Sequence, residues 1–310
     1  MTSFTRRALK AFFSLVLFTF SSSIFAQVDN RPGSVLAFPY YTSNADASAD
    51  TLITIANPSN IQVEVHLYFI ERGFCQQGDI PFSLTPNATI TMKMSEMDPM
   101  SSGYLIAVAQ DLNGNVTPAA CISGNAFIKA PAGYLFSGAG EIRGDYGATG
   151  FKALSSFSPV DGILELNFDG IKLEKLPRMF AAELQNPTVA PGQTIVIGGL
   201  VGDVSTGAIS GAAANGVGQL FNANEDARSF SAFIRGTCHS ISVFTATAPR
   251  VTVVGGINNF IIAGTVGIMK FPTAGGAGIL ITPRNNAGWS GIRTLTYVST
   301  TNGKLLVPAF

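Results

Sequence analysis

The chain has 310 residues, of which 46% are hydrophobic and only 12% are charged, and 19 basic and 19 acidic side chains give a formal net charge of zero. Nucleic-acid binding needs clustered Lys and Arg, and the sequence has no such cluster, so nucleic acid is excluded as a partner. The length is sufficient for two domains, each with its own hydrophobic core.

The amino-terminal segment is typical of a secretory signal peptide. Arg6, Arg7 and Lys10 precede an apolar run at residues 11–20, and residues 21–26 follow, ending in the small residue Ala26. Because this run is shorter than the roughly 20 residues that span a membrane, we predict cleavage after Ala26. We therefore expect a secreted, cell-surface or periplasmic protein without an integral membrane span in its mature part.

Alternating apolar and polar residues predict strands throughout the first half of the chain. In residues 63–69 the odd-numbered side chains are apolar, whereas Glu64 and His66 lie on the other face, which predicts one buried and one solvated face. Asn113-Gly114 predicts a hairpin turn. The other predicted strands are residues 34–41, 51–56, 80–84, 89–94, 104–109 and 120–128.

The second half of the chain also reads mainly as strands. Residues 163–168 are a predicted strand, and residues 172–185 are consistent with a short helix. Many short strands separated by turns are typical of β-sandwiches and β-barrels. The further predicted strands are residues 194–201, those near Leu220, and residues 229–235, 241–246, 251–254, 260–271, 292–298 and 304–307.

These patterns predict an all-β fold with two β-sandwich domains of Ig-like or jelly-roll topology after the signal peptide of residues 1–26. We place the first domain at residues 27–154 and the second at residues 191–310. Residues 155–190 are expected to be a linker, or a connecting strand with a short helix.

An outer-membrane β-barrel is an alternative, because such barrels often end in an aromatic strand and this chain ends at Phe310. Two observations weigh against the barrel. Pro308 would interrupt its last strand, and Trp289 is the only tryptophan available for an aromatic girdle.

Two segments suggest an internal duplication. Residues 56–75 and 223–238 both begin with Ala-Asn, continue into an alternating strand and end with Arg, Gly and Cys. This similarity predicts that residues 63–69 and 229–235 form equivalent strands, with Leu67 and Ala232 both facing a core.

The chain contains three cysteines. Export would place them in an oxidising compartment, and we predict a disulfide between Cys75 and Cys121 because both flank strands of the first domain. Cys238 would then remain unpaired. Three buried free thiols are the alternative. Cysteine and histidine spacings do not fit a zinc site, and we expect neither a metal nor another cofactor.

No residue pattern indicates catalysis. His66 is expected on a solvated strand face, and His239, next to Cys238, would point away from that thiol if both lie on a strand. Residues 111–115 are similar to the start of a calcium loop but lack its closing Glu, so a plain turn is the better interpretation. Residues 141–145 are interpreted as a solvated loop.

Several short motifs follow one another along the chain: Thr51-Leu52-Ile53-Thr54-Ile55, Cys75, Asp98-Pro99 before Gly103-Tyr104, Cys121 before Ile128-Lys129, Phe168-Asp169-Gly170 with Leu176-Pro177-Arg178, and Gly236-Thr237-Cys238. In this order they resemble a group of secreted bacterial proteins with no established function. The resemblance spans most of the mature chain and implies a bacterial, exported protein of two β parts. It carries over no catalytic residue and no activity.

We therefore predict an exported, non-enzymatic structural or adhesive protein of the cell surface or matrix. Its partners would be surface or matrix components or glycans. A glycan-binding module or hydrolase accessory protein is the alternative from another functional class, and it would require exposed aromatic side chains beside polar ones.

Overall fold

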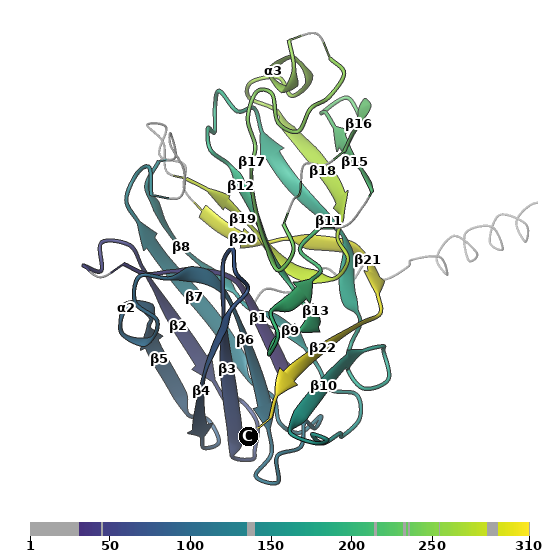
Figure 1. Ribbon diagram of the computed structural model, residues 1–310. Coiled ribbons are helices and arrows are strands. Elements are labelled where there is room, and N and C mark those ends of the chain that lie inside the picture. Colours follow the sequence, from purple (N-terminus) through teal and green to yellow (C-terminus); the bar gives the residue numbers. More distant parts are fainter. Residues whose placement is uncertain are drawn as a thin grey trace, which may run out of the picture.

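The computed structural model describes residues 31–44, 46–134, 140–213, 216–231, 234, 236–253, 255–283 and 291–309. The regular secondary structure in this part of the chain consists of strands and two four-residue helices, which confirms the all-β class (Figure 1). The strands form several open sheets, an arrangement consistent with β-sandwiches. No helix in the described ranges is long and apolar enough to cross a membrane.

Nine strands of the first half form what we term the first sheet pair: β1 (Val35–Thr42), β2 (Asp50–Ala56), β3 (Val63–Glu71), β4 (Gln77–Leu84), β5 (Thr89–Lys93), β6 (Ser102–Gln110), β7 (Ser123–Ala130), β8 (Ile142–Gly147) and β9 (Thr149–Phe151). Their orders are β4-β3-β6-β1-β9 and β5-β2-β7-β8. Every pairing is antiparallel. Alternating apolar side chains, such as Phe38, Ile53 and Ala107, belong to one buried core that both sheets supply.

Nine strands of the second half form the second sheet pair: β11 (Leu176–Gln185), β12 (Thr194–Gly199), β15 (Val217–Phe221), β16 (Ala227–Ser231), β17 (His239–Val243), β18 (Val266–Pro272), β19 (Gly276–Thr282), β20 (Gly291–Thr294) and β21 (Thr296–Thr301). Their orders are β16-β15-β18-β11-β21 and β17-β12-β19-β20. These pairings are also antiparallel. Phe180, Ile197 and Phe271 belong to its core.

The two sheet pairs have the same pairing scheme. If β11, β12, β15, β16, β17, β18, β19, β20 and β21 are matched in order to β1 through β9, each strand has the same neighbours in both halves. The short helix α2 (Met94–Met97) precedes β6, and α3 (Ile257–Phe260) precedes β18, so the helices also match.

This correspondence corrects the predicted strand equivalence. Residues 63–69 lie in β3, which matches β15, whereas residues 229–231 lie in β16, which matches β4. The two Ala-Asn dipeptides therefore mark different turns, one after β2 and one after β15. Leu67 is buried in the core as expected, and Ala232 lies outside the described residues.

A fifth sheet joins distant parts of the sequence. It has the order β10-β22-β13-β14 and contains β10 (Ile163–Phe168), β13 (Val201–Asp203), β14 (Ala208–Ser210) and β22 (Gly303–Pro308). β22 pairs with β10 along its whole length and runs parallel to β13. Leu166 and Leu305 of this sheet share a core with Ile106 of β6, so it covers the outer face of the first sheet pair.

This covering sheet changes the predicted environment of β3. We expected Glu64, His66 and Tyr68 on a solvated face, but His66 is 7% exposed and Tyr68 is 1% exposed. The Tyr68 hydroxyl donates a hydrogen bond to the carbonyl oxygen of Pro308, 2.6 Å away, at the end of β22. β3 is thus buried on both faces from residue 65 to residue 70, because a strand from the other end of the chain packs over it, whereas Glu64 is half-buried.

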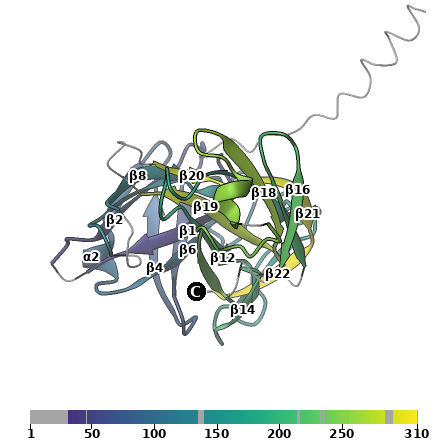
Figure 2. The same ribbon diagram turned by 90° about the horizontal axis from the view of Figure 1, so that it is seen from above.

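The two sheet pairs meet along β12 and β19, whose residues are buried on both faces. Ile195 and Ile197 belong to the core of the second sheet pair, whereas Val196 and Ile279 belong to that of the first. Seen from above, β12 and β19 lie between β2 and β8 on one side and β16 and β18 on the other (Figure 2).

Four further local predictions are wrong. Residues 172–185 hold the long strand β11 rather than a short helix, and residues 251–253 are not a strand. The Asn113-Gly114 turn joins β6 to β7, which lie in different sheets, so it is not a hairpin turn. Residues 142–147 form β8 rather than a solvated loop. The division into two domains stays a prediction, and β10 lies within its expected linker.

Candidate functional site

The disulfide joins Cys75 to Cys238 across 163 residues, with Cα atoms 6.0 Å apart, so the predicted Cys75–Cys121 bond is wrong. Cys121 is a free, half-buried thiol. Next to it, Ile122 bridges to Gly33 beside the start of β1, whereas Cys75 follows the end of β3. These places lie at opposite ends of the sheet, about 25 Å apart along β6. A disulfide requires Cα atoms within about 7 Å, which excludes that pair.

Beside this disulfide, two adjacent hollows of about 520 and 410 Å³ form what we call the Phe74 groove. Gln76 and Gln77 line both hollows. The larger is otherwise lined by Phe74 and by the β13–β14 loop, residues 204–207. The smaller is otherwise lined by Tyr41, Phe69, Glu71, Gly78, Asp98, Pro99, Met100 and Ser101. The groove therefore combines residues from both halves of the sequence.

Two strongly exposed apolar side chains lie in the groove. Phe74 is 77% exposed and Met100 is 76% exposed. Between them, Gln76 and Gln77 supply amide groups that both donate and accept hydrogen bonds. An exposed aromatic ring beside polar groups is the arrangement that binds ligands with one apolar and one polar side.

The β3–β4 turn that carries Phe74 is fixed at its centre. Cys75 lies between Phe74 and Gln76, and the disulfide connects it to the segment before β17. The Cys75 amide also donates a hydrogen bond to the carbonyl oxygen of Glu71, 3.2 Å away. Gly207 packs against this turn so closely that an added Cβ would lie 3.2 Å from the Cys75 carbonyl oxygen. One wall of the groove is thereby held in place.

The opposite wall is held by Tyr41 and Ser43 of the first sheet pair. The Tyr41 hydroxyl donates a hydrogen bond to the Asp98 carboxylate, and it lies 3.1 Å from the Ser101 hydroxyl. Burial, reinforced by Asp98, raises the pKa of Tyr41, so the phenol keeps its proton. The Ser43 hydroxyl donates to the backbone oxygen of Asp98 over 2.6 Å.

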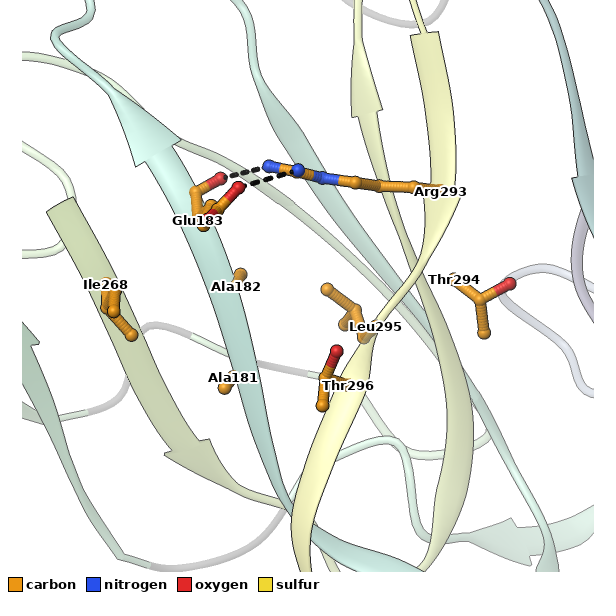
Figure 3. A pocket seen from close by; sticks show the side chains of 8 residues that line it. All are labelled: Ala181, Ala182, Glu183, Ile268, Arg293, Thr294, Leu295 and Thr296. Atoms are coloured by element: carbon orange, nitrogen blue, oxygen red, sulfur yellow. Dashed lines mark hydrogen bonds and ion pairs between the residues drawn. The ribbon is translucent and has the colours of Figure 1, made fainter. Parts of the chain in front are cut away.

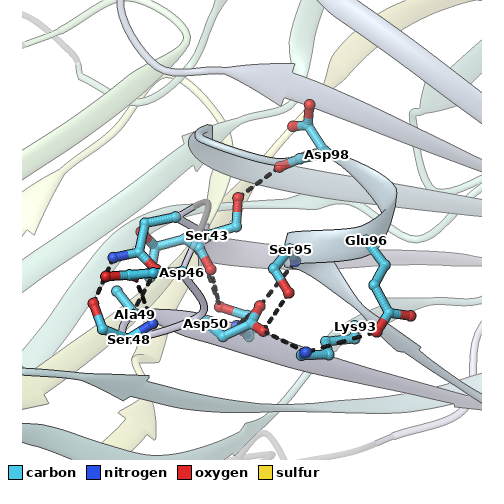
Figure 4. A network of polar contacts seen from close by, with 12 residues as sticks. Ser43, Asp46, Ser48, Ala49, Asp50, Lys93, Ser95, Glu96 and Asp98 are labelled. Atoms are coloured by element: carbon cyan, nitrogen blue, oxygen red, sulfur yellow. Dashed lines mark hydrogen bonds and ion pairs between the residues drawn. The ribbon is translucent and has the colours of Figure 1, made fainter.

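A polar network behind this wall anchors α2 to β2 (Figure 4). Asp50 is 8% exposed, and its carboxylate accepts hydrogen bonds from the backbone amide and the hydroxyl of Ser95, at 2.9 and 2.7 Å. Lys93 forms longer ion pairs with Asp50 and Glu96, at 3.9 and 3.6 Å. These contacts fix the helix that leads directly into residues 98–101.

Another hollow, of about 350 Å³, lies on the second sheet pair between β11 and the β20–β21 segment (Figure 3). Ala181, Ile268 and Leu295 give it an apolar lining. Its two charged residues bind each other, because Arg293 donates to the Glu183 carboxylate over 2.8 Å and to the Glu183 carbonyl oxygen over 2.9 Å. Since both charges are already paired, this hollow offers a ligand fewer polar contacts than the Phe74 groove.

The two histidines lie apart from the groove lining. His239 is buried, with Nε2 3.0 Å from the carbonyl oxygen of Pro39, and its ring stacks on Tyr40. Burial lowers the pKa of His239 to about 3 and that of His66 below its usual value. The neighbour of His239 in the sequence is Cys238, whose sulfur is in the disulfide, so a Cys–His nucleophile is not formed.

The remaining sequence candidates have structural roles or lie outside the described residues. Asp111 accepts hydrogen bonds from the backbone amides of Asn113 and Asn115, at 2.9 and 3.0 Å, as expected for a plain turn. In the described ranges, no three His, Cys, Asp or Glu side chains are placed to hold a metal ion. Trp289 and Phe310 lie outside these ranges.

Sequence reasoning did not find the Phe74 groove. The only local signal at Phe74 is that it precedes Cys75, between two predicted strands. The groove depends on contact between residues 74–77 and residues 204–207, which no local pattern encodes.

Comparison with known proteins gave no match: no protein-family model, no curated protein and no solved structure is similar to this chain.

Proposed function

We propose that this chain is an exported, non-enzymatic adhesive protein of the cell surface or matrix, and that the Phe74 groove is its contact site. The signal-peptide pattern of residues 1–26 supports export, with cleavage after Ala26. The Cys75–Cys238 disulfide agrees with an oxidising compartment.

The observation that carries this proposal is the preformed geometry of the groove. The disulfide fixes the β3–β4 turn, and Tyr41 and Ser43 fix the opposite wall. Phe74 and Met100 nevertheless remain largely exposed to solvent. A binding site whose residues are already ordered loses less conformational entropy on binding, which favours a contact role.

We further propose that the two sheet pairs are β-sandwich domains that arose by internal duplication. Their identical pairing schemes, including the matching positions of α2 and α3, support this origin. The fifth sheet would then consist of additions: β10 between the domains, β13 and β14 inserted in the second, and β22 at the carboxyl end.

Adhesion can be tested with beads coated with residues 27–310 and placed on extracellular matrix from cells that produce the protein. We expect coated beads to resist washing and Phe74→Ala beads to detach. The matched control is Leu112→Ala, because Leu112 is similarly exposed, at 64%, but lies in the turn after β6. Equal retention of the wild type, Phe74→Ala and uncoated beads would refute the adhesive role.

A further inference from the structure

The chemistry of the Phe74 groove restricts its ligand. Its lining includes two carboxylates, from Glu71 and Asp98, but no Lys or Arg among the described residues. Arg72, in the same turn, is not part of this lining. A ligand rich in phosphate, sulfate or carboxylate would therefore meet like charge without compensation, whereas a ligand that donates hydrogen bonds would meet acceptors.

Gln77, which lines both hollows, adds a further acceptor to the groove. The side-chain oxygen of Gln77 is buried and accepts no hydrogen bond within the described part of the chain. An unpaired buried acceptor is unfavourable, so this amide gains stability if it rotates toward a donor on a ligand. Gln76 is exposed, and Ser205 and Thr206 contribute hydroxyl groups on the far side of the larger hollow.

The Ser205 side of the groove is also ordered. Asp203 accepts hydrogen bonds from the amide and the hydroxyl of Ser205, at 2.9 and 2.6 Å. The hydroxyl bond, together with the others that this carboxylate accepts, lowers the pKa of Asp203. Asp203 therefore stays ionised and holds the loop that faces Phe74.

Phe74 supplies the apolar part of the site. Its exposed ring lies in the same hollow as Gln76, Gln77 and Ser205. Sugar rings have apolar C–H faces that pack on aromatic rings and hydroxyl edges that donate to amides and carboxylates. We propose that the Phe74 groove binds a neutral glycan, with one sugar ring on Phe74 and neighbouring hydroxyls on Gln76, Gln77 and Asp98. This inference rests on the proposed adhesive function, because it names the ligand class of the same groove.

The test uses the oxidised chain of residues 27–310 and three panels of immobilised probes. The first contains neutral oligosaccharides of glucose, galactose, mannose and N-acetylglucosamine. The second contains sulfated and uronic-acid oligosaccharides, and the third contains lysine-rich peptides. We expect binding to at least one neutral probe, weakened about tenfold or more by Phe74→Ala and by Gln76→Ala. Leu112→Ala should bind within about twofold of the wild type.

Both groove substitutions replace exposed side chains, so thermal unfolding should confirm that the variants are folded. Phe74-dependent binding of acidic oligosaccharides or lysine-rich peptides in place of neutral probes would overturn the proposed ligand class. Binding of neutral probes that is insensitive to both substitutions would overturn the proposed site. If no probe binds while beads still adhere through Phe74, the glycan inference fails and the adhesive function stands. Wild-type beads that adhere no better than uncoated beads would refute the function itself.

Discussion

Removal of the Cys75–Cys238 disulfide should cause a large loss of stability. The change is the double substitution Cys75→Ala and Cys238→Ala, which leaves no polar group in a site where both residues are almost fully buried. In the loop-closure model the stabilisation grows with the length of chain between the cysteines. For a sequence separation of 163 residues, this model gives about 5 kcal/mol.

This loss is large relative to the about 5–15 kcal/mol by which folded domains are usually stable. The disulfide also connects the β3–β4 turn of the first sheet pair to the segment before β17 of the second. The double variant should therefore lose the fixed geometry of the Phe74 groove as well as stability. Cys121→Ala is the matched control, because Cys121 is a free thiol.

The free energy of unfolding can be measured by urea denaturation at pH 7 without reductant, for the wild type, the double variant and Cys121→Ala. We expect the double variant to lose several kcal/mol and Cys121→Ala to change by less than about 1 kcal/mol. Non-reducing peptide mapping should show Cys75 linked to Cys238. A linked Cys75–Cys121 peptide, or a larger loss for Cys121→Ala than for the double variant, would refute the reasoning.

Two further predictions concern the buried interior. His239 has a pKa of about 3 when folded and about 6.5 when unfolded, so only the unfolded chain gains its proton between these values. The contribution of His239 to the free energy of unfolding should therefore fall by about 1.4 kcal/mol per pH unit as the pH decreases from about 6 toward 3. This contribution is measured as the difference in unfolding free energy between the wild type and His239→Asn. A difference that does not change with pH would contradict the prediction. Gly198→Ala would place a Cβ 2.7 Å from the Tyr104 ring, so it should lower the free energy of unfolding by about 1–3 kcal/mol. Gly291→Ala is the control, because the space around Gly291 is open and its unfolding free energy should not fall in this way. Equal denaturation midpoints for the two variants would disprove this packing.

The strand content could be predicted from the sequence because alternation is a local signal. Residues 51–56 and 63–69 alternate clearly, and they form β2 and most of β3. The prediction of a short helix at residues 172–185 was wrong, because Leu176-Pro177-Arg178 interrupts the alternation of apolar and polar residues that would have indicated a strand. In the structure, Pro177 lies next to a β-bulge between β11 and β21, where proline is tolerated.

The partners of each strand could not be predicted, because pairing joins residues that are far apart in the sequence. Two short motifs that both end in Cys suggested equivalent strands, yet the strands differ by one position in the shared pairing scheme. The same limit applies to the disulfide. The positions of Cys75 and Cys121 in one sheet pair did not reveal that they lie at opposite ends of it.

The two sheet pairs share a pairing scheme, but their matching β3–β4 and β15–β16 turns have different surroundings. In the second, β12 is followed by β13 and β14 before β15 begins, and the β13–β14 loop packs against the β3–β4 turn. The matching turn, between β15 and β16, instead closes on itself, since Asn222 accepts hydrogen bonds from the backbone amides of Asn224 and Asp226. The larger hollow of the groove therefore depends on contact between the β13–β14 loop and the β3–β4 turn. Shortening residues 204–207 should remove the larger hollow while both sheet pairs keep their cores.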